Sequence, residues 1–222
     1  MYQSLFYKEW IKTRKIVGLL VVVFAGLISY IFIDILQQLR TAGAVNFVEA
    51  VVQKDIFLLP LMKYLPVLAG ILLAISQYTP EMQNKRLKLT LHLPLSESSI
   101  ISAMVGYGFI VMSTVLIVSF AILLIGLRIL FPIEIVCANL LSALPWFLAG
   151  LAGYLLAAWV CLEPVWKYRV FNSIPGIGIL SFFFISAKSG GFITFLPELV
   201  IIIVVSFSFG YYSVARFKEG AQ

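Results

Sequence analysis

The chain has 222 residues, of which 62% are hydrophobic and only 12% are charged, and its mean hydropathy is +1.05. Soluble globular chains are close to half apolar and about a quarter charged, so this composition excludes an ordinary soluble domain and indicates lipid as the solvent. The formal net charge of +6 comes from basic residues scattered between apolar runs. Such scatter does not form a nucleic-acid-binding face, and it is typical of membrane-protein loops.

The first predicted element is a short basic helix over about residues 3–14. Lys8 and Lys12 lie four residues apart on one helical face, and Phe6 and Trp10 lie four apart on another. A helix of this kind tends to lie in the membrane interface, with its rings among the headgroups and its cations towards anionic lipid. The alternative is a positively charged flank that only fixes the orientation of the first span.

Six apolar segments follow, each long enough to cross a bilayer as a helix, which takes about twenty residues. We expect these spans at about residues 16–36, 57–78, 100–127, 135–162, 170–187 and 195–215. Pro175 and its neighbouring glycines can interrupt a helix, so the continuity of the fifth span stays open. The fourth span has a face of small residues suited to close packing within the chain or between subunits: Ala149, Gly150, Ala152, Gly153 and Ala157.

Lysine and arginine are distributed unevenly between the predicted connections. Eleven fall before the first span, in the second and fourth connections and after the last span, whereas four fall in the other connections. This bias places both termini in the cytoplasm and agrees with an even number of spans. The connections are too short for a soluble domain, so residues 1–222 are predicted as one all-α, multi-pass domain of a cell membrane, with the bacterial cytoplasmic membrane as the expected one.

The connection between the second and third spans contains the stretch NKRLKLTLHLPLS, residues 84–96, in which leucine occupies every second position. This alternation is typical of a half-buried strand, but no other connection is long enough to pair with it, and an unpaired strand is unstable. As a helix, the stretch places Lys85, Lys88 and His92 on one face, and Pro94 ends it. We therefore favour a short helix along the cytoplasmic surface.

These features together resemble the permeases of ABC-2 type exporters. That family has a basic amphipathic N-terminal helix, six spans, and a first cytoplasmic loop with an acidic residue, often Gly-Thr, alternating leucines, then Leu-Pro and a small residue. This chain has Glu81, then alternating leucines, then Leu93-Pro94-Leu95-Ser96, and its opening KEWIKTRK is also similar to the family's. It departs from the pattern at Lys85-Arg86, where Gly-Thr is common, and at Lys88, where an acidic residue is common.

The resemblance implies the transmembrane subunit of an ATP-driven exporter, partnered by ABC ATPase subunits, a second permease (identical or related) and membrane lipid. It also implies that the segment from Glu81 is a coupling helix on the ATPase; the alternative is a loop that rests on lipid headgroups. The chain has no G-x-x-x-x-G-K-[ST] phosphate loop, so we expect it to bind no cofactor, with ATP and Mg²⁺ on a partner. The implied coupling residues are Glu81, Lys85, Arg86, Lys88, Leu89, His92, Leu93 and Pro94.

Other function classes fit the residues less well. A Ser–His enzyme needs a histidine at membrane depth, but the one histidine, His92, lies in a predicted cytoplasmic connection. A metal-dependent lipid enzyme needs clustered carboxylates, whereas the 10 acidic residues are spread along the chain, so we expect no enzyme. The remaining alternatives are a secondary transporter or assembly scaffold of six helices and, within the ABC family, a permease similar to haem exporters.

Lys63 is the one basic residue inside a predicted span. Charges within the membrane are costly and are functional candidates by default. A lysine near the end of a span can also extend its ammonium group outward to water, here past Pro60. Both interpretations of Lys63 stay open.

Overall fold

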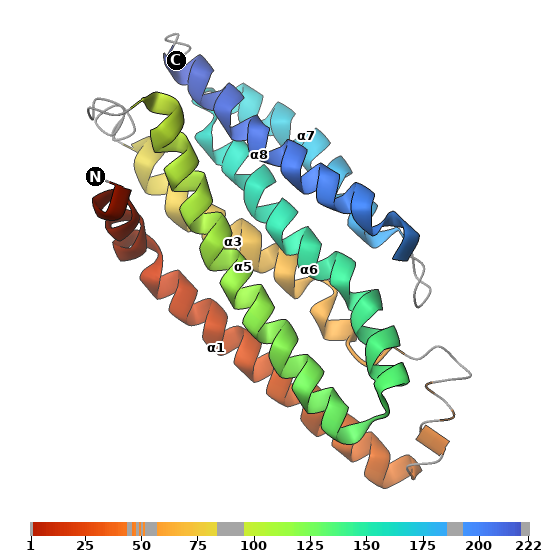
Figure 1. Ribbon diagram of the computed structural model, residues 1–222. Helices are drawn as coiled ribbons and strands as arrows, with labels where there is room; N and C mark the ends of the chain where they lie inside the picture. Colours follow the sequence, from red (N-terminus) through yellow and green to blue (C-terminus); the bar gives the residue numbers. More distant parts are fainter. Residues whose placement is uncertain are drawn as a thin grey trace.

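The computed structural model describes most of the chain, and every regular element in that part is a helix. The described residues are 2–43, 46, 47, 49, 51, 57–83, 96–185 and 193–218. The long helices run roughly side by side, and the two termini lie at the same end of the molecule (Figure 1). The prediction of an all-α chain is confirmed over these residues.

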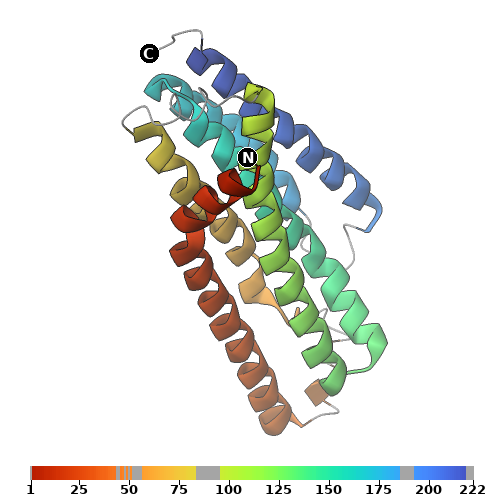
Figure 2. The same ribbon diagram turned by 60° about the vertical axis from the view of Figure 1, so that its left-hand side comes forward.

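Helix α1 spans Tyr2–Ala42 without a proline, and it is 41 residues long. It ends at Gly43, whose φ of 78° is a conformation that favours glycine at a helix C-terminus. At 1.5 Å per residue α1 is about 60 Å long, about twice the thickness of a bilayer's hydrocarbon core. The predicted helix at 3–14 and span at 16–36 are therefore one continuous helix, because no residue between them breaks it. Its first turns are inclined to the rest (Figure 2).

The second predicted span, 57–78, forms a short 3-10 helix, η1 at Pro60–Met62, and then helix α3 at Leu65–Met82. Pro66 lies in the first turn of α3, where its missing N–H leaves no hydrogen bond unmade. The α-helix thus begins later than predicted and continues past the predicted end. Helices α5, Glu97–Leu130, and α6, Ile133–Leu162, follow the third and fourth predicted spans closely.

The fifth predicted span is helix α7, Trp166–Ser181, which continues directly into the 3-10 helix η3, Phe182–Phe184. The helix is continuous through Pro175, so the question that the sequence left open is answered. It has 16 residues, or about 24 Å at 1.5 Å per residue. Helix α8, Leu196–Lys218, follows the short 3-10 helix η4 at Ile193–Phe195.

In the described part of the chain, four helical segments are long and apolar enough to cross a membrane. They are Tyr2–Thr41, Pro60–Met82, Ser98–Leu130 and Ile133–Leu162. The apolar part of α8, Leu196–Gly210, is shorter. Large apolar side chains also face outward, such as Ile129, which is 78% exposed, and Val22, which is 69% exposed. These features indicate a membrane protein.

Helix α6 is the centre of the packing and contacts α3, α5, α7 and α8. Its closest neighbour is α3, because glycines let the two backbones meet. A Cβ atom on Gly70 of α3 would collide with the Gly150 carbonyl oxygen, and one on Gly150 would lie 2.9 Å from the Cβ atom of Pro66. Ala149 and Ala152 are fully buried. The predicted small-residue face of α6 therefore packs within the chain, as small residues do between membrane helices.

Candidate functional site

Four charged side chains from α1 and α3 form an ion cluster, which consists of Lys8, Glu9, Lys12 and Glu81. The Lys12 ammonium donates hydrogen bonds of 2.7 Å to Oε1 of Glu9 and 2.7 Å to Oε1 of Glu81. The Lys8 Nζ atom lies 3.0 Å from the same Glu81 oxygen. Both carboxylates are almost fully buried. Buried charges are stable only when they are paired, so this cluster fixes the start of α1 to the end of α3.

A chain of hydrogen bonds continues from the ion cluster into α5 and α6. The Gln77 side-chain amide donates to Oε2 of Glu9 at 3.1 Å and to the Met104 carbonyl at 2.8 Å. The Tyr154 hydroxyl donates to Oε1 of Gln77 at 2.9 Å and lies 3.0 Å from the Tyr78 hydroxyl. Gln77, Tyr78 and Tyr154 are all fully buried. One polar network therefore joins α1, α3, α5 and α6, with Gln77 at its branch point.

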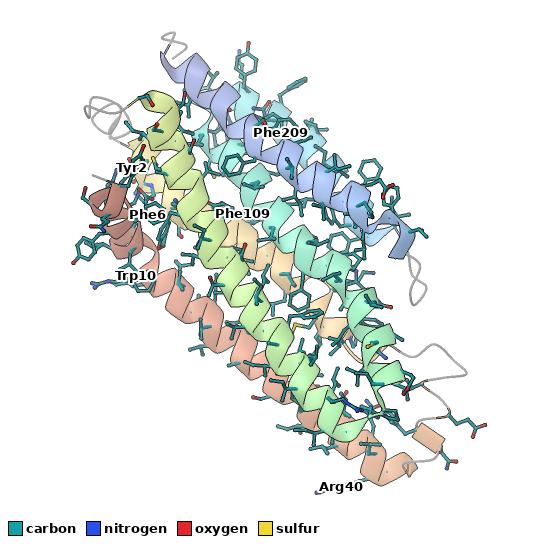
Figure 3. All side chains as sticks on the ribbon, viewed as in Figure 1. Tyr2, Phe6, Trp10, Arg40, Phe109 and Phe209 are labelled. Carbon is teal, nitrogen blue, oxygen red and sulfur yellow. The ribbon has the colours of Figure 1, made fainter. Side chains whose placement is uncertain are left out.

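A second contact holds the first turns of α1 against α5. The Thr13 hydroxyl lies 2.8 Å from the Tyr107 hydroxyl and donates to the Glu9 carbonyl at 3.0 Å. The Phe6 ring packs edge-on against the Tyr107 ring, with 5.7 Å between centroids. Trp10 instead remains 45% exposed. Figure 3 shows Phe6 and Trp10 on the first turns of α1 and Arg40 at its opposite end.

The two carboxyl groups of the ion cluster, which lie outside the spans predicted at 16–36 and 57–78, have opposite pKa shifts. Burial raises the pKa of Glu9 above its ordinary 4.5, and the attraction of Lys12 offsets this only in part. Burial also raises the pKa of Glu81, but hydrogen bonds and charge attraction from Lys12 and Lys8 outweigh it and lower the pKa overall. The two lysines therefore outweigh the effect of burial at Glu81 but not at Glu9.

The structure gives the basic residues of α1 a different environment from the one predicted. The sequence predicts that the cations of Lys8 and Lys12 face anionic lipid, whereas in the structure both bind carboxylates and Lys12 is mostly buried. The reason is that the two buried carboxylates need counter-charges. Phe6 likewise contacts Tyr107 rather than lying free among headgroups. Helical periodicity identified the face that Lys8 and Lys12 share, but it could not identify the partner on another helix.

The predicted coupling segment is mostly outside the described residues. Lys85, Arg86, Lys88, Leu89, His92, Leu93 and Pro94 belong to that undescribed part. Its two flanks are described: α3 ends with Gln83 as its C-cap, and Ser96 is the N-cap of α5. Glu81, the first residue of the predicted segment, lies inside the ion cluster. The ends of α3 and α5 that this segment connects lie near the termini of the chain (Figure 1).

Lys63 lies in the turn between η1 and α3, directly before the α-helix begins. Its ammonium group is 5.3 Å from the centre of the Tyr64 ring, and that ring stacks on Phe184 with 5.5 Å between centroids. A cation over an aromatic face is an attractive contact of about 0.5–1 kcal/mol when exposed. Lys63 is thus at the helix start, away from the ion cluster.

A further polar cluster, not identified from the sequence, joins α6, α7 and α8. Glu163 is only 1% exposed. Its Oε2 atom accepts hydrogen bonds from Ser213 at 2.8 Å and from Asn172 at 3.4 Å. The Arg169 guanidinium donates to the Glu163 carbonyl at 2.6 Å. The signal in the sequence was an acidic residue directly after an apolar span, but the partners on α7 and α8 are distant in sequence.

Removing the Tyr154 hydroxyl should destabilise the helix bundle. Tyr154→Phe leaves the buried Oε1 of Gln77 and the hydroxyl of Tyr78 without a shared partner, at a cost of about 1–3 kcal/mol. Tyr30→Phe is the matched control, because Tyr30 is 57% exposed. Thermal unfolding in detergent measures both variants. Equal melting temperatures for the two variants would contradict a structural role for the network.

The described residues contain no group of three His, Cys, Asp or Glu side chains that could hold a metal ion. Comparison of the chain with protein-family models, with curated proteins and with solved structures finds no match. The function is therefore inferred from the residues and from their geometry.

Proposed function

We propose that the chain is the membrane-spanning subunit of an ATP-driven exporter, similar to the ABC-2 permeases. It works with separate ATPase subunits, which bind the ATP and Mg²⁺, and with a second permease that is identical or related. The single observation that supports this best is the position of Glu81. The acidic residue that opens the loop pattern is buried and paired with Lys8 and Lys12 from the basic opening segment. The two regions that carry the resemblance are thus in direct contact.

The geometry supports a route by which motion could pass from an ATPase into the membrane. In the proposal, the ATPase binds residues 84–95, which connect α3 to α5. Glu81 lies at the end of α3, so displacement of that connection acts first on the ion pairs with Lys8 and Lys12. The hydrogen bonds of Gln77 continue this connection to α5, and those of Tyr154 to α6. Packed interfaces of this kind change by rearranging between discrete states, as alternating access requires.

The proposal includes six spans with both termini in the cytoplasm. The end of α3 and the start of α5 lie at the same end of the molecule as the two termini (Figure 1), which is in accord with that topology, as is the bias of eleven basic residues against four. Helix α7 is short for a span, and α8 is apolar over Leu196–Gly210. We propose that both cross the membrane as the fifth and sixth spans.

Association with an ATPase tests this proposal. The tagged chain is co-expressed with a candidate ABC ATPase from the same genome, and the amount of ATPase that co-purifies is measured. We expect wild type to retain the ATPase and Leu89→Asp/Leu93→Asp to lose it, because carboxylates replace the apolar docking face. Trp166→Asp is the control, an equally drastic change at a 72% exposed residue of the other predicted cytoplasmic connection.

Equal retention by wild type and Leu89→Asp/Leu93→Asp would rule out the predicted coupling segment as the docking site. Failure of every candidate ATPase to bind wild type would instead favour the scaffold or secondary transporter. With either result, the ion cluster would stabilise the fold but would not transmit motion from an ATPase.

A further inference from the structure

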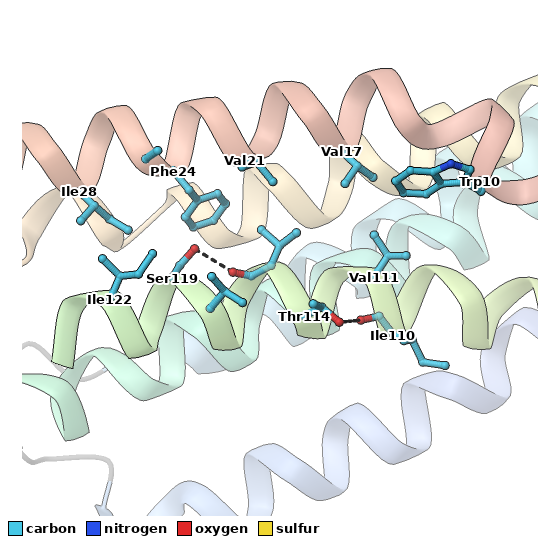
Figure 4. Close-up of a pocket in the computed structure, with 13 residues that line it drawn as sticks. Trp10, Val17, Val21, Phe24, Ile28, Ile110, Val111, Thr114, Ser119 and Ile122 are labelled. Atoms are coloured by element: carbon cyan, nitrogen blue, oxygen red, sulfur yellow. Dashed lines mark hydrogen bonds between the residues drawn. The ribbon is translucent and has the colours of Figure 1, made fainter. Parts of the chain in front are cut away.

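An apolar groove runs along the outside of the molecule between α1 and α5 (Figure 4). Its volume is about 350 Å³. Its α1 wall extends from Trp10 to Ile28, or about 27 Å at 1.5 Å per residue. That length is close to the roughly 30 Å thickness of a bilayer's hydrocarbon core. The groove therefore suits an extended hydrocarbon chain that runs along the direction of the helices.

Apart from the indole N–H of Trp10 at one end, the residues that line the groove present no free polar side-chain group. Its two hydroxyl groups on α5 are bonded within their own helix: Thr114 donates to the Ile110 carbonyl and Ser119 donates to the Val115 carbonyl, both at 2.8 Å. The remaining lining residues are apolar or aromatic. A hydrocarbon chain can fill such a groove without leaving a polar group unsatisfied, whereas water would gain few hydrogen bonds there.

The side of α1 that lines the groove also carries a positive charge near one end of the groove. Four of the α1 residues that line the groove recur at alternating spacings of four and three: Val17, Val21, Phe24 and Ile28. The same spacing extended backwards passes through Arg14 to Trp10, so helical periodicity puts Arg14 on the same side of α1 as the lining residues, between Trp10 and Val17. Arg14 is exposed. Trp10 is also partly exposed, and tryptophan is the residue type that is enriched at the depth of the lipid headgroups.

The nearest carboxylates do not cancel this charge. Glu9 and Glu81 are buried and bound by Lys8 and Lys12, and no described acidic side chain forms an ion pair with Arg14. The planar guanidinium of arginine binds a phosphate group through paired hydrogen bonds. The groove thus combines an apolar slot with a phosphate-binding group near one end.

We infer that this groove is a binding site for one anionic phospholipid. One acyl chain lies between α1 and α5, and Arg14 holds the headgroup phosphate beside the Trp10 ring. A second copy of the chain fits the site less well, because copies with the same orientation in the membrane would bring two Arg14 side chains to the same depth, where like charges repel. This inference requires a membrane but does not depend on the exporter proposal.

Native mass spectrometry of the delipidated full-length protein tests the site. The probe is an equimolar mixture of phosphatidylglycerol and phosphatidylcholine with identical acyl chains, and the readout is the number and kind of lipids retained per chain. We expect wild type to retain one phosphatidylglycerol in preference to phosphatidylcholine. Inorganic phosphate alone should not displace it. Displacement of the lipid by inorganic phosphate would mean that the acyl chain contributes nothing to binding, and it would overturn the proposal.

Two adjacent valines provide a variant and a matched control that test the contact with the acyl chain. Val21 lines the groove and Val22 lies outside it, and both are exposed, so neither replacement should prevent folding. Val21→Trp fills the slot and should weaken binding by about tenfold or more, since displacing even two methylene groups costs that much. Val22→Trp should bind as wild type does. Equal binding by the two variants would overturn the proposal.

Arg14 and Lys15 supply the matched pair for the headgroup, because both are exposed but only Arg14 shares the face of the groove. Arg14→Gln should reduce the preference for phosphatidylglycerol by about fivefold, and Lys15→Gln should leave it unchanged. Equal effects of Arg14→Gln and Lys15→Gln would mean that the lipid is held by the general surface charge and not by a headgroup site at Arg14. A dimer that dissociates on Val21→Trp would assign the groove to a second copy and overturn the lipid site.

Discussion

Glu81→Gln should destabilise the protein by about 3 kcal/mol, which is an apparent melting temperature lower by about 10 °C. The amide keeps the size of the side chain but removes the charge that Lys12 and Lys8 face at 2.7 and 3.0 Å. Most of the loss comes from Lys12, whose side chain is 16% exposed. Lys8, at 37% exposed, can turn to water, so its pair contributes less. Thermal unfolding of the detergent-solubilised protein measures the difference.

Glu9→Gln is the matched control for Glu81→Gln and should cost only about 1 kcal/mol, the value of one lost hydrogen bond. The amide oxygen can accept from Lys12 or from Gln77 but not from both, and burial already disfavours the charge of Glu9, since it raises the pKa of that group. The dependence on pH separates the two sites. The lowered pKa of Glu81 stabilises the fold above pH 4.5, and this contribution is lost as the pH falls through the lowered value. Wild type should therefore lose its advantage over Glu81→Gln below pH 4.5. The raised pKa of Glu9 has the opposite effect on the stability of the fold. Protonated Glu9 stabilises the fold at low pH, and this contribution is lost as the pH rises through the raised pKa. Equal costs for both variants would contradict the assigned roles.

Gly70→Ala should cost about 3 kcal/mol or prevent folding, at the upper end of the effects of overpacking. The added Cβ would collide with the Gly150 carbonyl oxygen and would lie 2.9 Å from the Tyr154 backbone nitrogen. Backbone atoms cannot rotate away as a side chain would, so α3 and α6 must separate along their length. The yield of folded protein from membranes and its melting temperature measure the effect.

Gly106→Ala is the matched control for Gly70→Ala. Gly106 also lies in a long helix, α5, but a Cβ there would have no atom within 4 Å. Alanine favours a helix over glycine by up to about 1 kcal/mol, so this variant should be unchanged or slightly more stable. If Gly70→Ala behaved in the same way, the close α3–α6 contact would be wrong.

The sequence predicted the elements of the fold well, because each depends on local signals. Apolar length located the helices, and the small residues around Gly150 identified the face of α6 that packs closely. The differences lie at the boundaries of the elements. Some apolar runs begin before or end after the helix that they contain, and no proline or glycine separates the predicted helix at 3–14 from the span at 16–36. The helix predicted at 3–14 and the span predicted at 16–36 form one helix, α1, and α3 begins at Leu65 rather than near residue 57.

The polar network could not be predicted, because its members are distant along the chain. The bond between Lys12 and Glu81 joins residues 69 positions apart, and that between Tyr154 and Gln77 joins residues 77 apart. Periodicity shows which face of a helix is polar but not which helix it meets. A buried glutamine at the end of an apolar segment was a usable signal, since a polar group there needs partners on neighbouring helices. Glu163 is a similar case, because it is a polar residue directly after an apolar segment.

The most direct test of the proposed function is the ATP turnover of a candidate ATPase in lipid vesicles. Turnover is measured for the ATPase alone, with the wild-type chain, and with Leu89→Asp/Leu93→Asp. If the chain is a permease coupled through residues 81–96, wild type will change turnover several-fold and the double variant will return it to the value of the ATPase alone. The same turnover in all three preparations would contradict the proposal that this chain is driven by an ATPase.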